Sequence, residues 1–575
     1  MTTATGCERK TMKPGLEMRN TELVIAVLLA LPLTAVAAGP AAPGAGSILQ
    51  QIQPSLPQVP SSTDTGLTIH REGEGKLPQT RPFRVKKIEI TGNKKIDTAT
   101  LHGLVADSEG KDLTLAQLEE LAARITAYYR SSGYPLARAI VPAQTIHDGV
   151  VTIEVIEADY GKVRLDNRSR VNDLLLEETL SSLQSGQAIE QKSMDRALLL
   201  LSDIPGVAVD ASLRPGETVG TSDLIVIAQP APFVSGNAAL DNYGNRYTGR
   251  TRAGGTVNIN DPLHHGDLLS VSGLSSGSGM NYARASYETL LDGAGTRLGG
   301  SYSALHYILG DSLANLNGHG TAQVGSLWAK HPFIRSRETN LYGQIQYDHL
   351  KLEDNLDASG IQNYRHLDDW SGTLSGDLRD GMLTGAVNTW SLAFTSGHVG
   401  FDNAAAGASD AATANTQGGF SKWNGTFSRL QGLTQKDSLY LSLSGQWTGD
   451  NLDASQQMVA GGPYTVRAYD MGVLSGDSGY LGSAEFRHDL GQYWRGQWQM
   501  VAFYDSEHVM VNRVLWVGGA NSATLSGAGF GLDWAGPDAW TARAYVAKPV
   551  GPNPDLVAVT ATYSARAWLQ VAKAF

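Results

Sequence analysis

The stretch 437-DSLYLSLSGQWT-448 alternates apolar and polar side chains along its length. Successive side chains of a β-strand point to opposite faces, so one face of this strand is apolar and the other polar. The apolar positions are Leu439, Leu441, Leu443 and Trp447, and the polar ones are Ser438, Ser442, Ser444 and Gln446. Two such faces are typical of a membrane β-barrel, whose outer face contacts lipid and whose inner face lines a polar lumen.

The same alternation recurs in residues 339–348, 480–489, 497–505 and 529–534. A soluble secreted β-sandwich is the alternative, but its inner faces would have to be apolar and dry. No apolar run reaches the roughly 18–20 residues that a membrane-spanning helix needs. Residues 230–575 are therefore predicted to form a membrane β-barrel. At roughly 22 residues per strand with its connection the span would hold about 16 antiparallel strands, a count that the residues alone do not fix. The polar segment at residues 403–419 is expected to be a long extracellular loop.

The composition divides the chain and excludes several classes of protein. All 11 tryptophans follow residue 230, and charged residues make up only 18% of a chain of 575 residues. The formal net charge of −11 offers no basic surplus for binding nucleic acid. A single cysteine, Cys7, excludes an intramolecular disulfide framework and any cysteine-cluster metal site. The histidines show no metal-ligand spacing, and no phosphate-binding loop or nucleophile elbow is present, so we expect no enzyme, metal or cofactor.

The N-terminus has the pattern of an export signal. Basic residues precede an apolar run at residues 23–38, and the small residues of Ala35-Val36-Ala37 supply a cleavage pattern. Residues 1–37 are therefore predicted to be a signal peptide. Residues 38–81 are rich in Pro, Gln, Ser, Gly and Thr, which predicts a linker with one short helix near residues 47–53.

Residues 82–229 carry the same order of predicted elements twice. The first unit, 82–158, has a strand at 83–91, helices at 98–106 and 115–131, and strands at 137–141 and 150–156. The second unit, 159–229, repeats this order with a strand at 162–165, helices near 171–183 and 193–202, and strands at 207–213 and 223–227. Each unit is predicted to be a small α+β module with the order β-α-α-β-β.

These modules resemble POTRA (polypeptide-transport-associated) domains, most specifically in YYRSSGYPLARAIVP at residues 128–142. The whole layout resembles the two-partner secretion transporters, the TpsB family of haemolysin secretion/activation proteins. The resemblance is carried by LDNYGNRYTG at 240–249, NDPL at 260–263, GGPYTVRAYDMGVLSGDSG at 461–479, AFYDSEHV at 502–509 and GAGFGLDW at 527–534. It implies a barrel of sixteen strands behind two periplasmic POTRA domains, in the outer membrane of a Gram-negative bacterium.

The resemblance also implies a loop that folds back into the barrel and is held by an arginine. In this sequence the loop motif contains Val466, Arg467 and Tyr469, with Ala468 where the family usually has glycine. An arginine can bind a carboxylate through two parallel hydrogen bonds. The expected partner is Asp505 on the lumen-facing parity of its strand, with Asp533 and Glu485 as alternatives.

Two predicted strands are candidate edges to which an extended substrate could add by β-augmentation. The candidate substrate-binding residues are Ala137, Ala139 and Val141 in the first module, and Val207, Val209 and Ala211 in the second. The C-terminal aromatic residue Phe575 resembles the signal read by the barrel-assembly machinery. The implied function is transport of one unfolded exoprotein, such as a haemolysin, an adhesin or a growth inhibitor, to the cell surface; an insertase of other barrels is the alternative.

Overall fold

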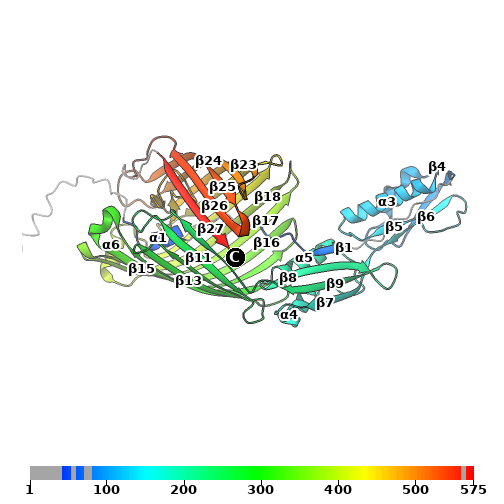
Figure 1. Cartoon of the computed structure of the whole chain (residues 1–575), viewed down its shortest axis with the longest axis horizontal. Helices are drawn as coiled ribbons and strands as arrows, with labels where there is room; N and C mark the ends of the chain where they lie inside the picture. The colour runs from blue at the N-terminus through cyan, green and yellow to red at the C-terminus, as the bar shows by residue number, and fades with distance from the viewer. Residues whose placement is uncertain (1–41, 53–59, 70–80, 558–564) are drawn as a thin grey trace, which may run out of the picture. The chain divides into compact units, whose positions relative to one another are not determined.

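The computed structural model describes residues 42–52, 60–69, 81–557 and 565–575 (Figure 1). The predicted signal peptide lies outside these residues. Among the described helices, none combines the length and apolar character needed to cross a bilayer.

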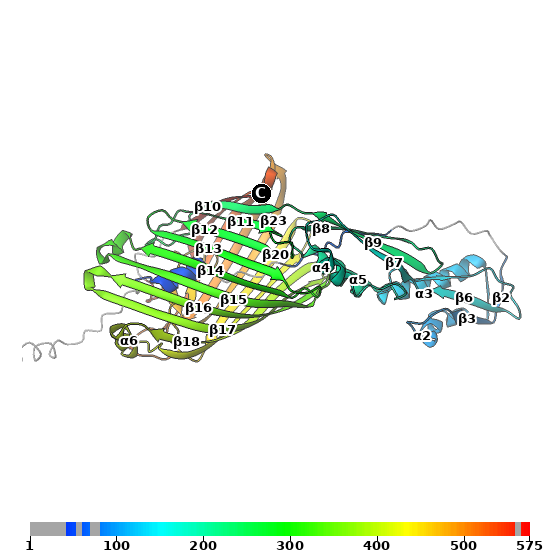
Figure 2. The same cartoon turned by 90° about the horizontal axis from the view of Figure 1, so that it is seen from below.

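Sixteen antiparallel strands close into a barrel, as the sequence and its family resemblance predicted. Each strand pairs with its neighbours in chain order, and β27 returns to pair with β10 (Figure 2). The strands are β10 (Val234–Asp241), β11 (Arg252–Asn260), β12 (Leu268–Ser275), β13 (Met280–Leu290), β14 (Arg297–Ile308), β15 (Gly318–Ile334), β16 (Thr339–Leu356), β17 (Ile361–Asp380), β18 (Ala386–Phe401), β19 (Gly418–Gly432), β20 (Asp437–Thr448), β23 (Ser478–Tyr493), β24 (Gly496–Met510), β25 (Ser522–Ala535), β26 (Trp540–Pro549) and β27 (Arg566–Ala574).

The two faces of the strands differ as the alternation predicted. On β20 the outward side chains Leu443 and Trp447 are 55% and 58% exposed, whereas the inward Gln446 and Thr448 are buried. An apolar outer face suits lipid contact, and a polar inner face suits a lumen.

The lumen is not uniformly polar, which the alternation alone did not predict. The helix α1 (Ala45–Ile52) lies inside the barrel, visible between the strands in Figure 2. Its buried side chains Ile48 and Leu49 belong to an apolar cluster with inward residues such as Tyr307 and Leu352. The helix predicted at 47–53 thus begins two residues earlier, and the barrel wall supplies an apolar surface where it packs.

The connections carry short elements. The predicted loop at 403–419 contains a helix, α6 (Ala404–Ala411), because its alanine-rich sequence favours helix, and its last residues already belong to β19. Between β20 and β23 the chain forms a small hairpin of β21 (Met458–Ala460) and β22 (Leu474–Gly476). The 3₁₀ turns are η2 (Asp311–Leu316), η3 (Asp357–Ser359) and η4 (Pro537–Ala539).

The first module has a three-stranded sheet of order β3-β6-β5 and a separate pair of β2 with β4. Its elements are β2 (Phe83–Val85), β3 (Lys87–Thr91), α2 (Thr98–Gly103), η1 (Ala106–Ser108), β4 (Lys111–Leu113), α3 (Leu115–Ser131), β5 (Arg138–Ile140) and β6 (Val150–Ile156). Helix α3 begins at a capping box, with Thr114 and Gln117 exchanging hydrogen bonds. The single strand predicted at 83–91 is divided at Lys86, because β2 pairs with β4 while β3 pairs with β6.

The second module has a four-stranded sheet of order β1-β8-β9-β7. Its elements are β7 (Asp159–Asn167), α4 (Asp173–Leu180), α5 (Gln191–Ser202), β8 (Val207–Pro215) and β9 (Thr221–Pro230). The outer strand β1 (Leu67–Ile69) comes from the linker and pairs in parallel with β8. The core of the second module is a leucine-rich cluster around α5 that includes Leu198 and Leu201.

Candidate functional site

The loop between β20 and β23 places Arg467 against the inner wall of the barrel. Its Nε and Nη2 donate to the two carboxylate oxygens of Asp505 at 2.8 and 2.7 Å, and its backbone N–H donates to the same carboxylate at 3.2 Å. Arg467 is 5% exposed and Asp505 is fully buried. This is the bidentate geometry in which an arginine fixes a carboxylate most strongly.

Three further groups surround the guanidinium of Arg467. Its Nη1 donates to Glu485 at 2.7 Å, and its Nη2 donates to the Ser483 hydroxyl at 3.2 Å. The guanidinium lies 3.5 Å from the centre of the Phe503 ring. The indole N–H of Trp568 donates to the backbone carbonyl of Arg467 at 2.7 Å, which ties the loop to the last strand. Arg467 therefore engages three strands of the wall, β23, β24 and β27.

Sequence reasoning did not single out Phe503 or Trp568. Phe503 lies two residues before Asp505 on the same strand and therefore on the same lumen-facing parity. That parity was available from the sequence. The Trp568 contact was not, because the tryptophan reaches a carbonyl 101 residues away in the chain.

The residues that flank Arg467 are packed against the wall. Val466 and Tyr469 are 0% and 1% exposed and belong to a cluster with Leu525. Ala468 lies directly over Gly527 of β25, where an added Cβ would approach the Ala468 Cβ to 2.4 Å. The absence of a side chain at Gly527 therefore makes room for alanine at position 468.

Asp533 is not brought to Arg467. Its carboxylate accepts the hydroxyl hydrogen of Tyr545 at 2.6 Å and lies 3.9 Å from Arg543. Asp533 and Arg467 do line one cavity of about 520 Å³, so Asp533 faces the lumen without holding the loop.

Polar contacts hold α1 in the lumen in addition to its apolar packing. The backbone N–H of Ala45 donates to Asp354 at 2.7 Å, and the side chains of Asn245 and Gln51 form a hydrogen bond of 2.9 Å. Arg365 joins Asp354 to Asp453 at 2.8 and 2.5 Å. The helix thus occupies the passage that the barrel strands enclose.

The two predicted substrate-binding edges differ from expectation. In the first module β5 is the edge of its sheet, but the N–H group of one of its residues and that of the residue just before it already have acceptors. Ala139 donates to the Thr126 hydroxyl at 2.9 Å and Ala137 to the Tyr134 carbonyl at 3.3 Å, while Val141 lies beyond the end of the strand. This edge offers an incoming strand fewer donors than its position in the sheet suggests.

In the second module the expectation of a free edge is wrong for part of β8. Val207 and Val209 precede the paired region, but Ala211 is the partner of Leu67 in β1. The backbone N–H of Ala211 donates to the carbonyl of Gly66 at 2.9 Å. The local signal for β1 is only the short stretch Leu67-Thr68-Ile69, so its addition to a strand some 140 residues away was not visible in the sequence.

Phe575 lies at the seam where the barrel closes. Its backbone exchanges two hydrogen bonds with Gly236, at 2.9 and 3.0 Å, and its side chain is 60% exposed. Among the described residues, no group of three or more histidine, cysteine, aspartate or glutamate side chains is arranged to hold a metal ion.

A closed barrel of sixteen strands, a lumen occupied by a helix and an arginine-held loop, and two small α+β modules define a POTRA-bearing outer-membrane barrel. The sequence profile of the haemolysin secretion/activation proteins (ShlB/FhaC/HecB) matches residues 220–533, and that of the ShlB-type POTRA domain matches residues 83–158. The chain belongs to this family, the outer-membrane transporters of two-partner secretion, whose POTRA domains lie in the periplasm.

Named relatives and solved structures agree with this assignment. The chain is 26% identical over 524 residues to the heme/hemopexin transporter protein HuxB of Haemophilus influenzae, covering 89% of this chain and 92% of the relative. It is 25% identical over 496 residues to the outer membrane transporter CdiB of Escherichia coli, covering 79% and 80%. The fold matches the solved structure of Escherichia coli CdiB with a TM-score of 0.67, at 22% identity over 92% of this chain and 95% of that one. Acinetobacter baumannii CdiB matches with a TM-score of 0.59, at 20% identity over 92% of this chain and 96% of that one.

Proposed function

We propose that this chain exports one exoprotein, which enters the barrel from the periplasm in an extended state and leaves at the cell surface. The observation that carries this proposal is the occupation of the lumen by two removable parts of the chain, α1 and the Arg467 loop. Both are held against the barrel wall by side-chain contacts, so the passage opens when the exoprotein replaces these contacts with its own. Besides the heme/hemopexin transporter protein HuxB, the relatives of this chain include the hemolysin transporter protein HpmB of Proteus mirabilis, which favours a secreted haemolysin-like or adhesin-like partner.

Transport of this kind needs no catalytic residue or cofactor in the transporter. The periplasm contains no ATP, so the free energy is proposed to come from folding of the exoprotein outside the cell. The chain is accordingly proposed not to be an enzyme.

Two further partners belong to the biogenesis of the transporter. The outward aromatic side chains, among them Trp370, Trp447 and Tyr480, are 58–60% exposed and suit contact with outer-membrane lipid. The last strand, closed by Phe575 at the β10 seam, is proposed to be recognised by the barrel-assembly machinery.

The test compares surface and medium proteins of cells with and without this gene. We expect one large exoprotein to disappear from the surface and medium of the deletion strain, and to return when the gene is restored but not when it carries Arg467→Ala. Other outer-membrane proteins should stay at their normal levels. A general loss of outer-membrane proteins would instead indicate an insertase of other barrels, and no lost exoprotein would contradict the proposal.

A further inference from the structure

The linker segment Ser61–Ile69 lies on a strip of surface shared by the second POTRA module and the barrel residues next to it. At one end of the strip, β1 adds to the edge of β8, with Leu67 opposite Ala211 and Ile69 opposite Leu213. The side chains of Leu67 and Ile69 pack against the core of the module. The sheet of the second module therefore already pairs, at this edge and in parallel orientation, with a strand from outside the module.

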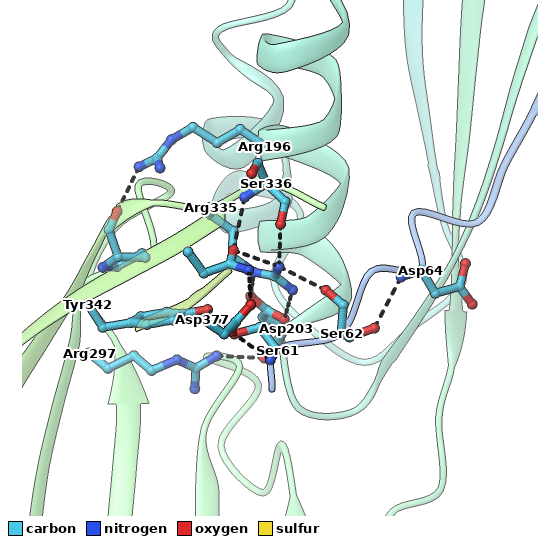
Figure 3. A network of polar contacts seen from close by, with 12 residues as sticks. Ser61, Ser62, Asp64, Arg196, Asp203, Arg297, Arg335, Ser336, Tyr342 and Asp377 are labelled. Atoms are coloured by element: carbon cyan, nitrogen blue, oxygen red, sulfur yellow. Dashed lines mark hydrogen bonds and ion pairs between the residues drawn. The ribbon is translucent and has the colours of Figure 1, made fainter. Parts of the chain in front are cut away.

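At the other end of the strip, barrel side chains bind the backbone of the linker (Figure 3). The Ser61 N–H donates to Asp377 at 2.9 Å, and Arg379 donates to the Ser61 carbonyl at 2.5 Å. Arg335 donates to the Ser62 carbonyl at 2.9 Å. These contacts use main-chain atoms that every residue except proline provides, so they select an extended conformation rather than a particular sequence.

The groups that bind the linker are held in place by contacts within the barrel and with the second module. The Arg335 side chain is fully buried and donates to both oxygens of Asp203, at the end of α5, at 2.7 and 2.8 Å (Figure 3). Asn340 joins Arg335 to Asp377 at 3.2 and 2.9 Å. A binding surface whose side chains are held in this way loses little conformational entropy when it accepts a ligand.

The strip has room for side chains larger than those of the linker. A cavity of about 270 Å³ lies beside Ser61 and Ser62, lined in part by Leu200, Lys330 and Tyr342. The Ser61 hydroxyl forms a hydrogen bond of 3.0 Å with the Tyr342 hydroxyl. A bulkier residue at these positions would enter the cavity while keeping the same main-chain contacts.

We propose that this strip, from the Arg335–Asp377 cradle to the edge of β8, is a binding site for an extended segment of the exoprotein. In the described state the chain's own linker occupies the site, and the exoprotein segment replaces it by making the same main-chain hydrogen bonds. The inference rests on the proposed function, because it names the place where the exported chain is received. The segment that fits has a residue other than proline in the cradle and two apolar residues, spaced by one, at the positions of Leu67 and Ile69.

Replacement of the linker also bears on the state of the lumen. Helix α1 and strand β1 belong to one continuous stretch of sequence, so release of Ser61–Ile69 from the strip removes contacts that anchor this stretch. Receipt of the exoprotein at the strip therefore favours departure of α1 from the passage.

The experiment fixes the linker to β8 and measures export. In a Cys7→Ala background, Thr68→Cys with Ser212→Cys joins two register partners across β1 and β8. The matched control, Ala208→Cys with Gln229→Cys, joins two register partners of β8 and β9 and leaves β1 free. Closure of each pair, by oxidation or by a short thiol crosslinker, is verified by loss of thiol labelling. We expect export to fall at least tenfold in the closed β1–β8 variant, to recover on reduction, and to be unchanged in the control.

A second measurement works without the exoprotein. A fluorescent peptide with the linker sequence PSSTDTGLTI is added to the purified full-length protein in detergent. We expect binding to the variant Leu67→Asp with Ile69→Asp, whose own β1 is weakened, and at least tenfold weaker binding when Arg335→Ala is added. The control Arg429→Ala, which removes a different barrel arginine, should leave binding unchanged.

The outcomes separate the two proposals. Equal export from the closed β1–β8 variant and the control, or loss of export in both, overturns the strip as the receiving site. If Arg335→Ala leaves the affinity for the peptide unchanged, the strip is also overturned as the receiving site. If the deletion strain loses no exoprotein, the proposed function fails, whereas the peptide measurement still decides whether the strip binds an extended chain.

Discussion

At the scale of single residues, the Arg467 contacts decide how firmly the loop is held. Loss of one partner of a buried ion pair leaves an unpaired buried charge and costs roughly 3–5 kcal/mol. Arg467→Ala leaves Asp505 and Glu485 buried without their shared cation, and we expect the loop to leave the wall and export to fall at least tenfold. Proteolysis of the region 461–473 and the amount of exported protein measure the two effects.

The matched control for that prediction is Arg429→Ala, which removes an arginine of β19 that lies on the same strand face as the exposed Phe427 and not on the inner wall. Arg429 pairs with Asp380 at 2.7 Å and is 23% exposed. Equal loss of export in both variants would show that removal of any barrel arginine impairs export, and would contradict a special role for the Arg467 loop.

The close contact between Ala468 and Gly527 gives a second prediction at this scale. Gly527→Ala places a Cβ where only 2.4 Å separate it from the Ala468 Cβ, and overpacking of this kind costs roughly 1–3 kcal/mol. We expect a lower melting temperature of the barrel on heated, semi-native gels. Adding Ala468→Gly should restore it, because the loop position then has no side chain; failure of this rescue would contradict the packing explanation.

The family resemblance implied the arginine-held loop, and strand parity limited its acidic partners for a physical reason. Strand parity alone puts Asp505 and Glu485 on the inner wall, and both contact Arg467. Parity also put Asp533 there, where it binds Tyr545 instead, because parity gives the face of a strand but not the height of a loop above it.

At the scale of elements, α1 is one of the two parts of the chain that occupy the lumen. Ile48→Asp with Leu49→Asp places two carboxylates in an apolar cluster, and burying an unpaired charge is strongly unfavourable. We expect the helix to leave the lumen and the conductance of the protein in planar bilayers to rise. Leu174→Asp, at a side chain that is 74% exposed in α4, should leave the conductance unchanged; an unchanged conductance in both would contradict the assignment of α1 as the obstruction.

The sequence predicted the elements that their own residues specify, but not those that depend on contacts with residues far away in the chain. Helix α3 follows from its own periodicity and its Thr114 cap, and the barrel strands follow from their alternation. Strand β1 depends on the edge of β8, and the apolar patch under α1 depends on several strands meeting, which no single stretch of sequence contains.

At the scale of the whole molecule, the seam between β10 and β27 distinguishes a transporter from an insertase. It is held by five register pairs, from Asn237 with Ala574 to Asp241 with Gln570. Passage through the lumen needs no opening of this seam, so closing it with Ala239→Cys and Ala572→Cys should leave export unchanged. Barrel assembly by lateral opening would be blocked.

Export is measured before and after reduction, beside a control pair, Asn237→Cys with Thr256→Cys, that joins β10 to β11. Loss of export in the seam pair alone would contradict passage through a permanently closed barrel.

The linker strand β1 also sets a threshold for what is exported. A ligand attached to its own receptor by a short tether competes at an effective concentration on the order of millimolar. A passing periplasmic peptide present at micromolar concentration would lose that competition even if it bound the β8 edge as well as Leu67–Ile69 does. Only a chain that binds through several segments at once, or that is delivered repeatedly to the periplasmic end of the barrel, overcomes this competition. Strand β1 therefore excludes unrelated periplasmic peptides from the β8 edge without any pocket for a specific side chain.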